Sequence, residues 1–203
     1  MPVPPHDHPP GPPAPLDAPT PPRRRWLQRA AGLTAAGVLV PMAAAPARAA
    51  LAPASGSRDL ALAHLHTRER LALVYAVDDR FVPDALGTLN HFLRDHYSGD
   101  VGEMDPQLYE LLHRVRRVLG SSERYEVISG YRAPATNAHL RATRGGGVAQ
   151  GSLHTQGRAI DVRLPGVALA DLRDAALSLR AGGVGFYPRE NFVHIDTGRV
   201  RHW

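Results

Sequence analysis

The sequence lacks three features that mark common classes of protein. None of its 203 residues is cysteine, which excludes disulfide bonds, thiolate metal sites and cysteine nucleophiles. Residues 50–203 carry 19 arginines against 17 acidic residues, and this near balance gives no case for nucleic acid as a partner, since that function usually needs a clustered basic face. The same range has no apolar run of about 20 residues, the length that a membrane-spanning helix needs. We therefore expect a mature protein that neither spans a membrane nor binds nucleic acid.

Proline is concentrated at the beginning of the chain, because thirteen of the 19 prolines fall in residues 1–49. Residues 1–22 are rich in proline and nearly free of charge, so they cannot bury enough apolar surface to offset the entropy of ordering them, and we expect disorder. Arginines follow at positions 23–25, then a weakly apolar run from Ala30 to Ala45 and the small-residue pattern of residues 47–49. A positive region, an apolar region and an A-x-A site in this order are typical of a secretory signal.

The pair Arg24-Arg25, followed by an aromatic residue and leucine, resembles a twin-arginine export signal. An uncleaved membrane anchor is the alternative, but glycine and proline interrupt the apolar run. We predict cleavage after Ala49 and expect the mature protein in the periplasm or cell envelope. The predicted organisation is a leader with a signal peptide over residues 1–49, a linker over residues 50–57 and a folded domain over residues 58–203.

Apolar periodicity predicts helices and strands in different parts of this domain. The predicted helices cover Pro83–His96, Asp105–Gly120 and Leu169–Leu179, and the predicted strands cover Tyr125–Ser129, Arg158–Leu164, Val184–Tyr187 and Asn191–Asp196. Helices first and strands later indicate an α+β fold, with a small antiparallel sheet flanked by helices. The glycine-rich residues 142–151 are expected to form a mobile loop.

Most of the eleven histidines have ordinary explanations. His91, His96 and His113 fall on predicted helices, where an exposed or core-edge histidine is usual. His64 and His66 alternate as metal ligands on a strand can, although a solvated strand face is the more common reason for such a pattern.

His154 differs because Asp161 follows it seven positions later. A regular helix would hold these residues roughly 10 Å apart. A straight strand would separate them by about 23 Å and point them to opposite faces. A bend is needed to bring both to one ion, and Gly157 between them permits one at little cost.

His194 and Asp196 lie in an alternating apolar segment, which sends both side chains to one face. Together, His154, Asp161 and His194 offer two imidazoles and one carboxylate, a set that suits a tetrahedral zinc ion with water in the fourth position. The spacing leaves another explanation open, in which Asp161 caps a turn and both histidines are buried in hydrogen bonds.

Four ordered motifs resemble those of the M15-type zinc peptidases, in particular a bacterial branch linked to murein endopeptidases. The motifs are Ser129–Arg132, Ser152-x-His154-x-x-Gly157-x-Ala159-x-Asp161, Gly183–Tyr187 and Phe192–Asp196, and the likeness continues to Trp203. It extends over almost the whole predicted domain. The resemblance implies the α+β fold of D-alanyl-D-alanine peptidases and hedgehog domains, Zn²⁺ held by His154, Asp161 and His194, and substrates among the short peptides of peptidoglycan.

The resemblance also implies roles for two polar residues. Arg132 matches an arginine that these peptidases use near the substrate, and a planar guanidinium suits a peptide carboxylate. A structural ion pair or a surface position is the other explanation for Arg132. Ser152 either donates a hydrogen bond to the substrate or caps the bend.

The sequence departs from the family at the general base. Better-known members have glutamate three residues before the last histidine ligand, and Asn191 stands there in this chain. An amide cannot accept the proton of the attacking water. Asp196 is our candidate for the base, because alternation puts it on the face of His194, and Glu190 in the preceding turn is the alternative. Asp196 has a second possible role, which is to orient a histidine ligand.

We therefore predict an exported zinc metallopeptidase that hydrolyses peptide bonds in the stems or cross-links of peptidoglycan, as an endopeptidase or a carboxypeptidase. Two other functions remain open at this point. One is a zinc-stabilised module that binds the cell wall without catalysis, and the other is a hydrolase for a free dipeptide such as D-alanyl-D-alanine.

Overall fold

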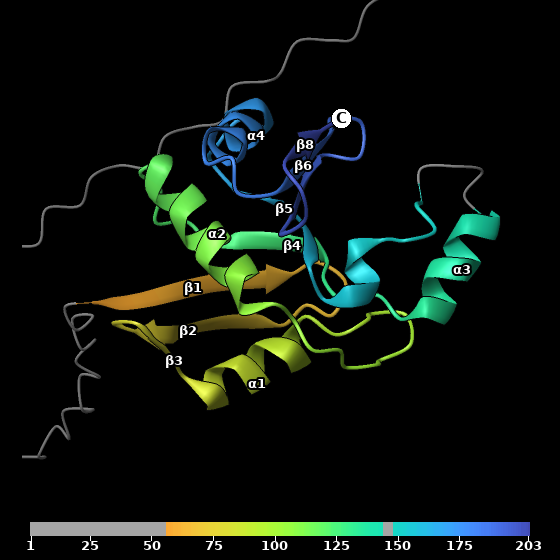
Figure 1. Ribbon diagram of the computed structural model, residues 1–203, viewed down its shortest axis with the longest axis horizontal. Coiled ribbons are helices and arrows are strands. Elements are labelled where there is room, and N and C mark those ends of the chain that lie inside the picture. The colour runs from red at the N-terminus through yellow and green to blue at the C-terminus, as the bar shows by residue number, and fades with distance from the viewer. Residues whose placement is uncertain (1–55, 144–147) are drawn as a thin grey trace, which may run out of the picture. The chain divides into compact units, whose positions relative to one another are not determined.

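The computed structural model describes residues 56–143 and 148–203 (Figure 1). The predicted leader, export signal and cleavage site lie outside the described residues. The helices are α1 (Pro83–Phe92), α2 (Pro106–Val118), α3 (Pro134–Thr143), α4 (Leu169–Ser178) and the 3₁₀ helix η1 (Leu153–Gln156). The strands are β1 (Ser57–His64), β2 (Arg70–Val77), β3 (Arg80–Phe81), β4 (Tyr125–Ser129), β5 (Ala159–Arg163), β6 (Gly183–Tyr187), β7 (Phe192–Asp196) and β8 (Arg201–His202).

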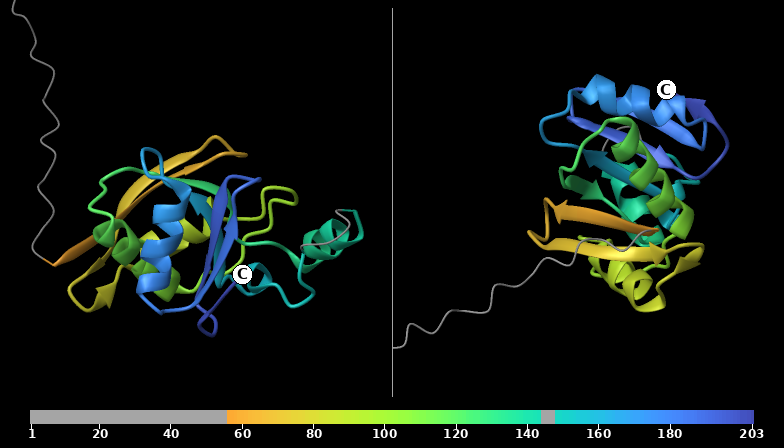
Figure 2. Two further views of the ribbon diagram at one scale, coloured as in Figure 1. Left: turned by 90° about the horizontal axis from the view of Figure 1, so that it is seen from above. Right: turned by 90° about the vertical axis from the view of Figure 1, so that its left-hand side faces the viewer.

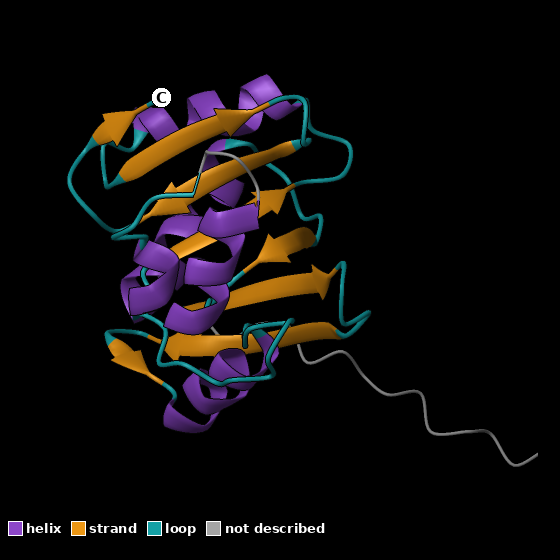
Figure 3. Ribbon diagram, turned by 90° about the vertical axis from the view of Figure 1, so that its right-hand side faces the viewer, coloured by secondary structure: helices purple, strands orange, loops and turns teal. Residues whose placement is uncertain are grey.

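The strands form one sheet of eight in the order β3-β2-β1-β4-β5-β7-β6-β8, and Figure 3 shows them side by side. Most neighbours are antiparallel, whereas β1 runs parallel to β4 and β6 runs parallel to β8. The α+β class predicted from the sequence is confirmed. The sheet is larger than predicted because β1, β2 and the two-residue strands β3 and β8 were not recognised. Leucines in β1 alternate with alanines, so the contrast between apolar and polar positions that marks a half-buried strand is absent there.

Helix α3 was not predicted either, because Leu140 is its one large apolar residue. It includes the first two residues of the predicted loop 142–151, while residues 144–147 lie outside the described part of the chain. The left view of Figure 2 shows α3 standing apart from the sheet, at the end of the molecule that also carries η1.

The remaining predicted elements are confirmed with ends shifted by one or two residues, except that α1 stops at Phe92 rather than at His96. The carbonyl oxygen of Leu93 accepts the Tyr131 N–H at 2.8 Å instead of a helical partner. Two residues later the carboxylate of Asp95, which is 1% exposed, accepts the N–H of Ala133 at 2.9 Å. These contacts bind the chain after α1 to the segment after β4, and His96 therefore lies in a loop.

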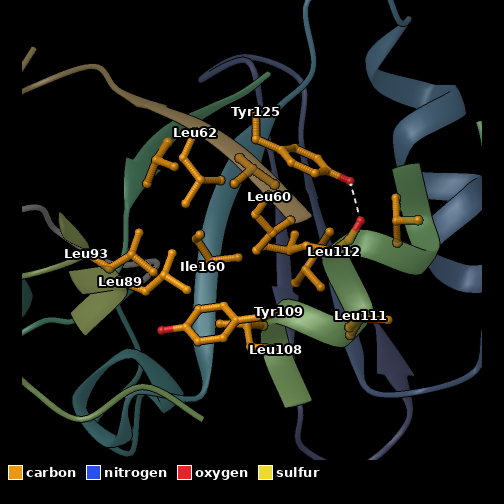
Figure 4. Packing of buried hydrophobic residues seen from close by; sticks show 14 of the residues in the cluster. Leu60, Leu62, Leu89, Leu93, Leu108, Tyr109, Leu111, Leu112, Tyr125 and Ile160 are labelled. Atoms are coloured by element: carbon orange, nitrogen blue, oxygen red, sulfur yellow. Dashed lines mark hydrogen bonds between the residues drawn. The ribbon is translucent and has the colours of Figure 1, made fainter. Parts of the chain in front are cut away.

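Helices α1, α2 and α4 cover one face of the sheet, and the hydrophobic core lies between them and the strands. α1 contacts β2, α2 contacts β1, and α4 contacts β6 and β7. Figure 4 shows leucines of α1 and α2 packed with Leu60 and Leu62 of β1 and Ile160 of β5. The buried hydroxyl of Tyr125 donates to the Leu112 carbonyl at 2.9 Å, so this polar atom is satisfied inside the core.

Alternation in β5 and β7 sends neighbouring side chains to opposite faces of the sheet. Ile160 of β5 and Val193 and Ile195 of β7 belong to the core. The residues between them, Asp161 and His194, therefore point to the other face, away from α1, α2 and α4. The polar residues that the sequence singled out lie on this second face. Among the described residues, no helix is long and apolar enough to cross a membrane.

Candidate metal centre

Three side chains of the sequence motifs meet on the second face of the sheet. The Nε2 atom of His154 lies 3.2 Å from Nδ1 of His194 and 3.3 Å from Oδ1 of Asp161, and the last two atoms are 2.8 Å apart. All three residues are buried, with exposed fractions of 2%, 8% and 6% for His154, His194 and Asp161. Within the described residues, they are the one group of three or more potential ligands whose donor atoms converge in this way.

The predicted bend at Gly157 brings His154 to Asp161. Gly157 ends η1 in the left-handed conformation, with φ of 66°, and a Cβ atom there would collide with the carbonyl oxygen of Glu103. Both features favour glycine. The Nδ1 atom of His154 lies 2.7 Å from the Gly130 carbonyl oxygen, which only accepts hydrogen bonds. His154 therefore holds a proton on Nδ1 and offers the lone pair of Nε2 to the site.

Strand pairing places the other two groups side by side. Asp161 of β5 is directly opposite His194 of β7 in the antiparallel register, so their side chains leave the same face at neighbouring positions. The Nε2 atom of His194 lies 3.2 Å from Oδ2 of Asp196. A carboxylate accepts hydrogen bonds, so this contact keeps the hydrogen atom on Nε2 and leaves Nδ1 of His194 to face the site.

Asp196 is completely buried and its two oxygens have several partners. Arg201 pairs with Oδ2 at 2.7 Å, and the N–H groups of Gly183 and Gly198 donate to Oδ1 at 3.0 and 2.8 Å. A Cβ atom at Gly183 would meet this carboxylate. Together with the contact to Nε2 of His194, these partners engage both oxygens of Asp196.

The charges of the site depend on each other. Burial by itself would lower the pKa of His194, but hydrogen bonds to Asp161 and Asp196 outweigh burial and raise this pKa to about 9. Burial would likewise raise the pKa of Asp161, whereas His154 and His194 hold it well below its usual range. The arrangement favours positive charge between these groups.

The donor set fits a divalent transition metal. Ligand atoms of a tetrahedral zinc ion at 2.0–2.1 Å lie about 3.3 Å from one another, which is close to the separations of His154 Nε2 from its two partners. The ring nitrogens that face the site belong to histidines whose other nitrogens are already engaged, as is typical of metal ligands. Two imidazoles and one carboxylate suit zinc and leave one position for water or substrate.

The three residues line a cavity of about 370 Å³ together with Arg132, Ser152 and Glu190. Asp196, our candidate for the general base, is not part of this lining. The Ser152 hydroxyl makes no capping hydrogen bond to η1, so the suggestion that its side chain caps the bend is wrong.

Arg132 lies beside the triad. Its guanidinium is 3.8 Å from Oδ2 of Asp161, and it donates to the Ser129 hydroxyl at 3.3 Å and to the Asn137 side-chain oxygen at 3.4 Å. Asn137 belongs to α3, so this helix, which the sequence did not reveal, supports the guanidinium at the cavity wall.

The cavity also contains residues that sequence reasoning missed. One wall is aromatic: the rings of Tyr187 and Phe192 stack with centroids 4.5 Å apart, and the Trp203 indole donates to the Tyr187 hydroxyl at 2.7 Å. His66 and His96 form part of another wall. Period-2 alternation through β6 and β7 could have indicated the aromatic wall, whereas the position of His66 and His96 depends on the unpredicted pairing of β1 with β4.

Comparison with known proteins identifies relatives of the chain. The M15 peptidase family model described as Peptidoglycan L,D-endopeptidase MepK matches residues 52–203. The chain is 43% identical over 180 residues to Peptidoglycan L,D-endopeptidase MepK of Escherichia coli (strain K12), an alignment that covers 89% of this chain and 96% of that protein. It is 42% identical over 147 residues to Probable peptidoglycan L,D-endopeptidase MepK of Haemophilus influenzae, with 72% and 78% covered.

No solved structure matches the chain at a comparable level of significance. M15 peptidases are generally metal dependent, in agreement with the group of histidine and aspartate side chains in the cavity. On the match to the family model and the identity to its members, the chain belongs to the M15 peptidase family described as peptidoglycan L,D-endopeptidase MepK.

Proposed function

We propose that this protein is a zinc metallopeptidase that hydrolyses a peptide bond in the stems or cross-links of peptidoglycan, with the L,D-endopeptidase specificity for which its relatives are named. The observation that carries the proposal is the convergence of His154, Asp161 and His194 in the wall of an open cavity. Peptidoglycan peptides carry free carboxylates, and Arg132 in the same wall offers a guanidinium to one of them.

His154, Asp161 and His194 would hold the zinc ion. Bound there, zinc would acidify a water molecule and polarise the scissile carbonyl group. The contribution of the chain is to fix the ligands: the Gly130 carbonyl holds the ring of His154, and Asp196 holds the ring of His194. Asp196 is on this proposal a positioning residue, since each of its oxygens is engaged and it does not line the cavity.

Glu190 is the residue that we assign to accept a proton in the reaction. Among the described residues, Glu190 and Asp161 are the carboxylates that line the cavity, and Asp161 belongs to the triad. Asn191, which follows Glu190, has a left-handed backbone with φ of 58°, a conformation that asparagine tolerates better than glutamate. The turn therefore suits asparagine at the position where other M15 enzymes carry their base.

We place the mature protein in the cell envelope, where its substrate is, and the twin-arginine route remains our proposal for export. A reporter fused to residues 1–57 tests it: replacement of Arg24 and Arg25 by lysine is expected to keep the reporter in the cytoplasm. Unchanged export of the variant would contradict the twin-arginine route and leave the enzymatic proposal untouched.

The decisive experiment is mass spectrometry of purified cross-linked muropeptides after incubation with zinc-loaded and chelated protein. Zinc-loaded protein is expected to release peptides whose masses identify the bond, and added zinc should restore the activity of the chelated sample. Because His91 is exposed on α1 and does not line the cavity, His91→Ala is the control for His154→Ala. Zinc-loaded protein that binds but never cleaves muropeptides would favour the non-catalytic binding module, and cleavage of free D-alanyl-D-alanine alone would favour the dipeptidase.

A further inference from the structure

A second group of histidines lies on the wall of the cavity. The rings of His66 and His96 are stacked, with centroids 4.1 Å apart and planes 3° from parallel, and both residues line the cavity with the triad. His66 follows β1 and is exposed, whereas His96 belongs to the loop after α1 and is half-buried. The stack fixes the direction of an exposed ring that would otherwise be free to rotate.

The sheet carries His66 toward the same end of its strands as the metal centre. His64, the last residue of β1, is level with Val127 of the parallel strand β4, and the turn that follows β1 carries His66. Ser129, at the end of β4, is level with Asp161 in the next strand. His66 and Asp161 therefore lie toward the same end of these strands, and both line the cavity.

The imidazole of His66 is not placed to bind a metal ion, because the triad is the one candidate ligand group among the described residues. Its neighbours also favour an anion over a cation. The carboxylate of Glu69 is paired with Arg94 at 2.7 Å. The charge of Arg201 is balanced by Asp196, so with a divalent cation at the triad the cavity lining still has a net positive charge: the cation and Arg132 against Asp161 and Glu190. An anionic group is attracted into such a cavity.

Asp95 connects this second histidine group to the rest of the site. Its carboxylate accepts the N–H of Tyr97, next to His96, at 2.8 Å and the N–H of Ala133, next to Arg132, at 2.9 Å. Burial would raise the pKa of Asp95, but hydrogen bonds from Thr136 and from these backbone groups lower it. One buried, ionised carboxylate thus holds in register the loop that carries His96 and the segment that carries Arg132.

We propose that His66, held by its stack on His96, forms a carboxylate-binding subsite for a peptidoglycan peptide in the cavity that the triad lines. The inference rests on the proposed function and adds to it the chemical group that the enzyme selects. An imidazole offers an N–H donor in either tautomer, and because the acceptor is an ionised carboxylate the hydrogen bond is charge-assisted. His96 is a positioning residue in this arrangement.

The test compares a cross-linked muropeptide whose stem peptides have free carboxylates with the same muropeptide after amidation of those groups. For the free acid, His66→Ala is expected to raise KM about tenfold with kcat within about twofold, as for loss of one hydrogen bond to a charged group at an exposed site. His66→Gln, which keeps an N–H donor, should recover part of the loss, and His91→Ala should match the wild type. For the amidated muropeptide, whose carbonyl oxygen accepts only a neutral hydrogen bond, His66→Ala should raise KM by less than it does for the free acid.

A binding measurement separates this inference from the proposed function. Isothermal titration calorimetry of the chelated protein with the free-acid muropeptide should give weaker binding for His66→Ala than for His91→Ala, whether or not the zinc-loaded enzyme cleaves. Absence of cleavage by every variant would overturn the proposed function. Cleavage with a KM that His66→Ala leaves unchanged, or raises equally for free and amidated muropeptides, would overturn the carboxylate subsite alone.

Discussion

The cavity brings together two groups of histidines whose electrostatic surroundings are opposite. In the first, His154 and His194 share Asp161, and Asp196 adds a second carboxylate behind His194. In the second, the cavity-lining pair His66 and His96 packs against His64, which does not line the cavity, with ring centroids 4.1 to 6.0 Å apart. The carboxylates raise the pKa of His194 to about 9. Burial, followed by the neighbouring rings of His96 and His66, lowers the pKa of His64 to about 4.

The difference shows that the partners of a histidine, rather than its presence near a cavity, decide which ligand it can take. In the first group, the carboxylates of Asp161 and Asp196 stabilise positive charge on the histidines, and a divalent cation can replace the protons that are bound there. Histidines packed against histidines resist positive charge among themselves, but the exposed ring at the edge of the group can still bind an anion. The two groups together offer one substrate both a polarising centre and an anchor for its charge.

The largest effect is expected from loss of a ligand in the first group. His154→Ala removes one of the two imidazole ligands of the site, and cleavage of muropeptides should fall by more than about 10³-fold, since loss of a single electrostatic stabiliser already costs 10²–10³. The zinc content of the purified variant, measured by mass spectrometry, should fall with it. Activity near that of the wild type, with zinc absent, would contradict the assignment of the metal centre.

A pH effect is expected from the second group. His64 is 2% exposed and faces His66, His96, Glu69 and Arg94. Because its pKa is about 4 in the folded protein against 6.5 when exposed, the unfolded chain binds the extra proton between these values. The folded state should therefore lose on the order of 3 kcal/mol from this group as pH falls from 6.5 to 4, with no further loss below.

His64→Asn tests this pH effect, because asparagine does not titrate and its side-chain oxygen can accept the His66 N–H that Nδ1 of His64 receives at 3.3 Å. The free energy of unfolding, measured in urea at pH 6.5 and pH 4.5, should fall less in His64→Asn than in the wild type, while exposed His91→Asn keeps the wild-type slope. An equal decrease of the unfolding free energy between pH 6.5 and pH 4.5 in all three proteins would show that His64 binds its proton as readily in the folded state as in the unfolded chain.

Asp196→Asn tests the role of the second carboxylate in the first group of histidines. If Asp196 orients His194, the variant should bind zinc 10- to 100-fold more weakly, as is usual for outer carboxylates of metal sites. Saturating zinc should then restore most of kcat. Glu190→Gln is expected to give the opposite pattern, with normal zinc affinity and a lowered kcat that zinc does not restore. A kcat that stays low in zinc-saturated Asp196→Asn would instead return Asp196 to the role of general base.

The sequence predicted local features of the site well, because local rules determine them. The bend at Gly157 follows from the need to bring His154 and Asp161, seven residues apart, to one point. The shared face of His194 and Asp196 follows from strand alternation. The partners of Asp196 were not predictable in this way. Arg201 reaches it from beyond a turn, and Gly183 donates from the neighbouring strand, so the choice between base and orienting carboxylate needed the three-dimensional arrangement.

The second histidine group was missed for a related reason. His66 enters the cavity because β1 runs parallel to β4, although more than 60 positions separate His64 from its partner Val127. His96 enters it because α1 stops early and Asp95 holds the following loop. The spacing of apolar residues along the chain reveals neither the parallel pairing nor the buried hydrogen bonds. The predicted helix was therefore extended to His96.

Ser152→Ala should give the smallest effect and show whether polar groups beside the triad contact the substrate. The Ser152 side chain does not cap η1, so its loss should change the free energy of unfolding by less than about 0.5 kcal/mol. A lost hydrogen bond to substrate, worth about 1 kcal/mol, should raise KM about fivefold and leave kcat within twofold. Thr155→Val is the matched control, because the Thr155 hydroxyl donates to the Ser152 carbonyl at 2.7 Å. Thr155→Val should lose about 1 kcal/mol of stability and keep its KM. A Ser152→Ala variant that loses stability but keeps its KM would show that the Ser152 side chain stabilises the fold and does not contact the substrate.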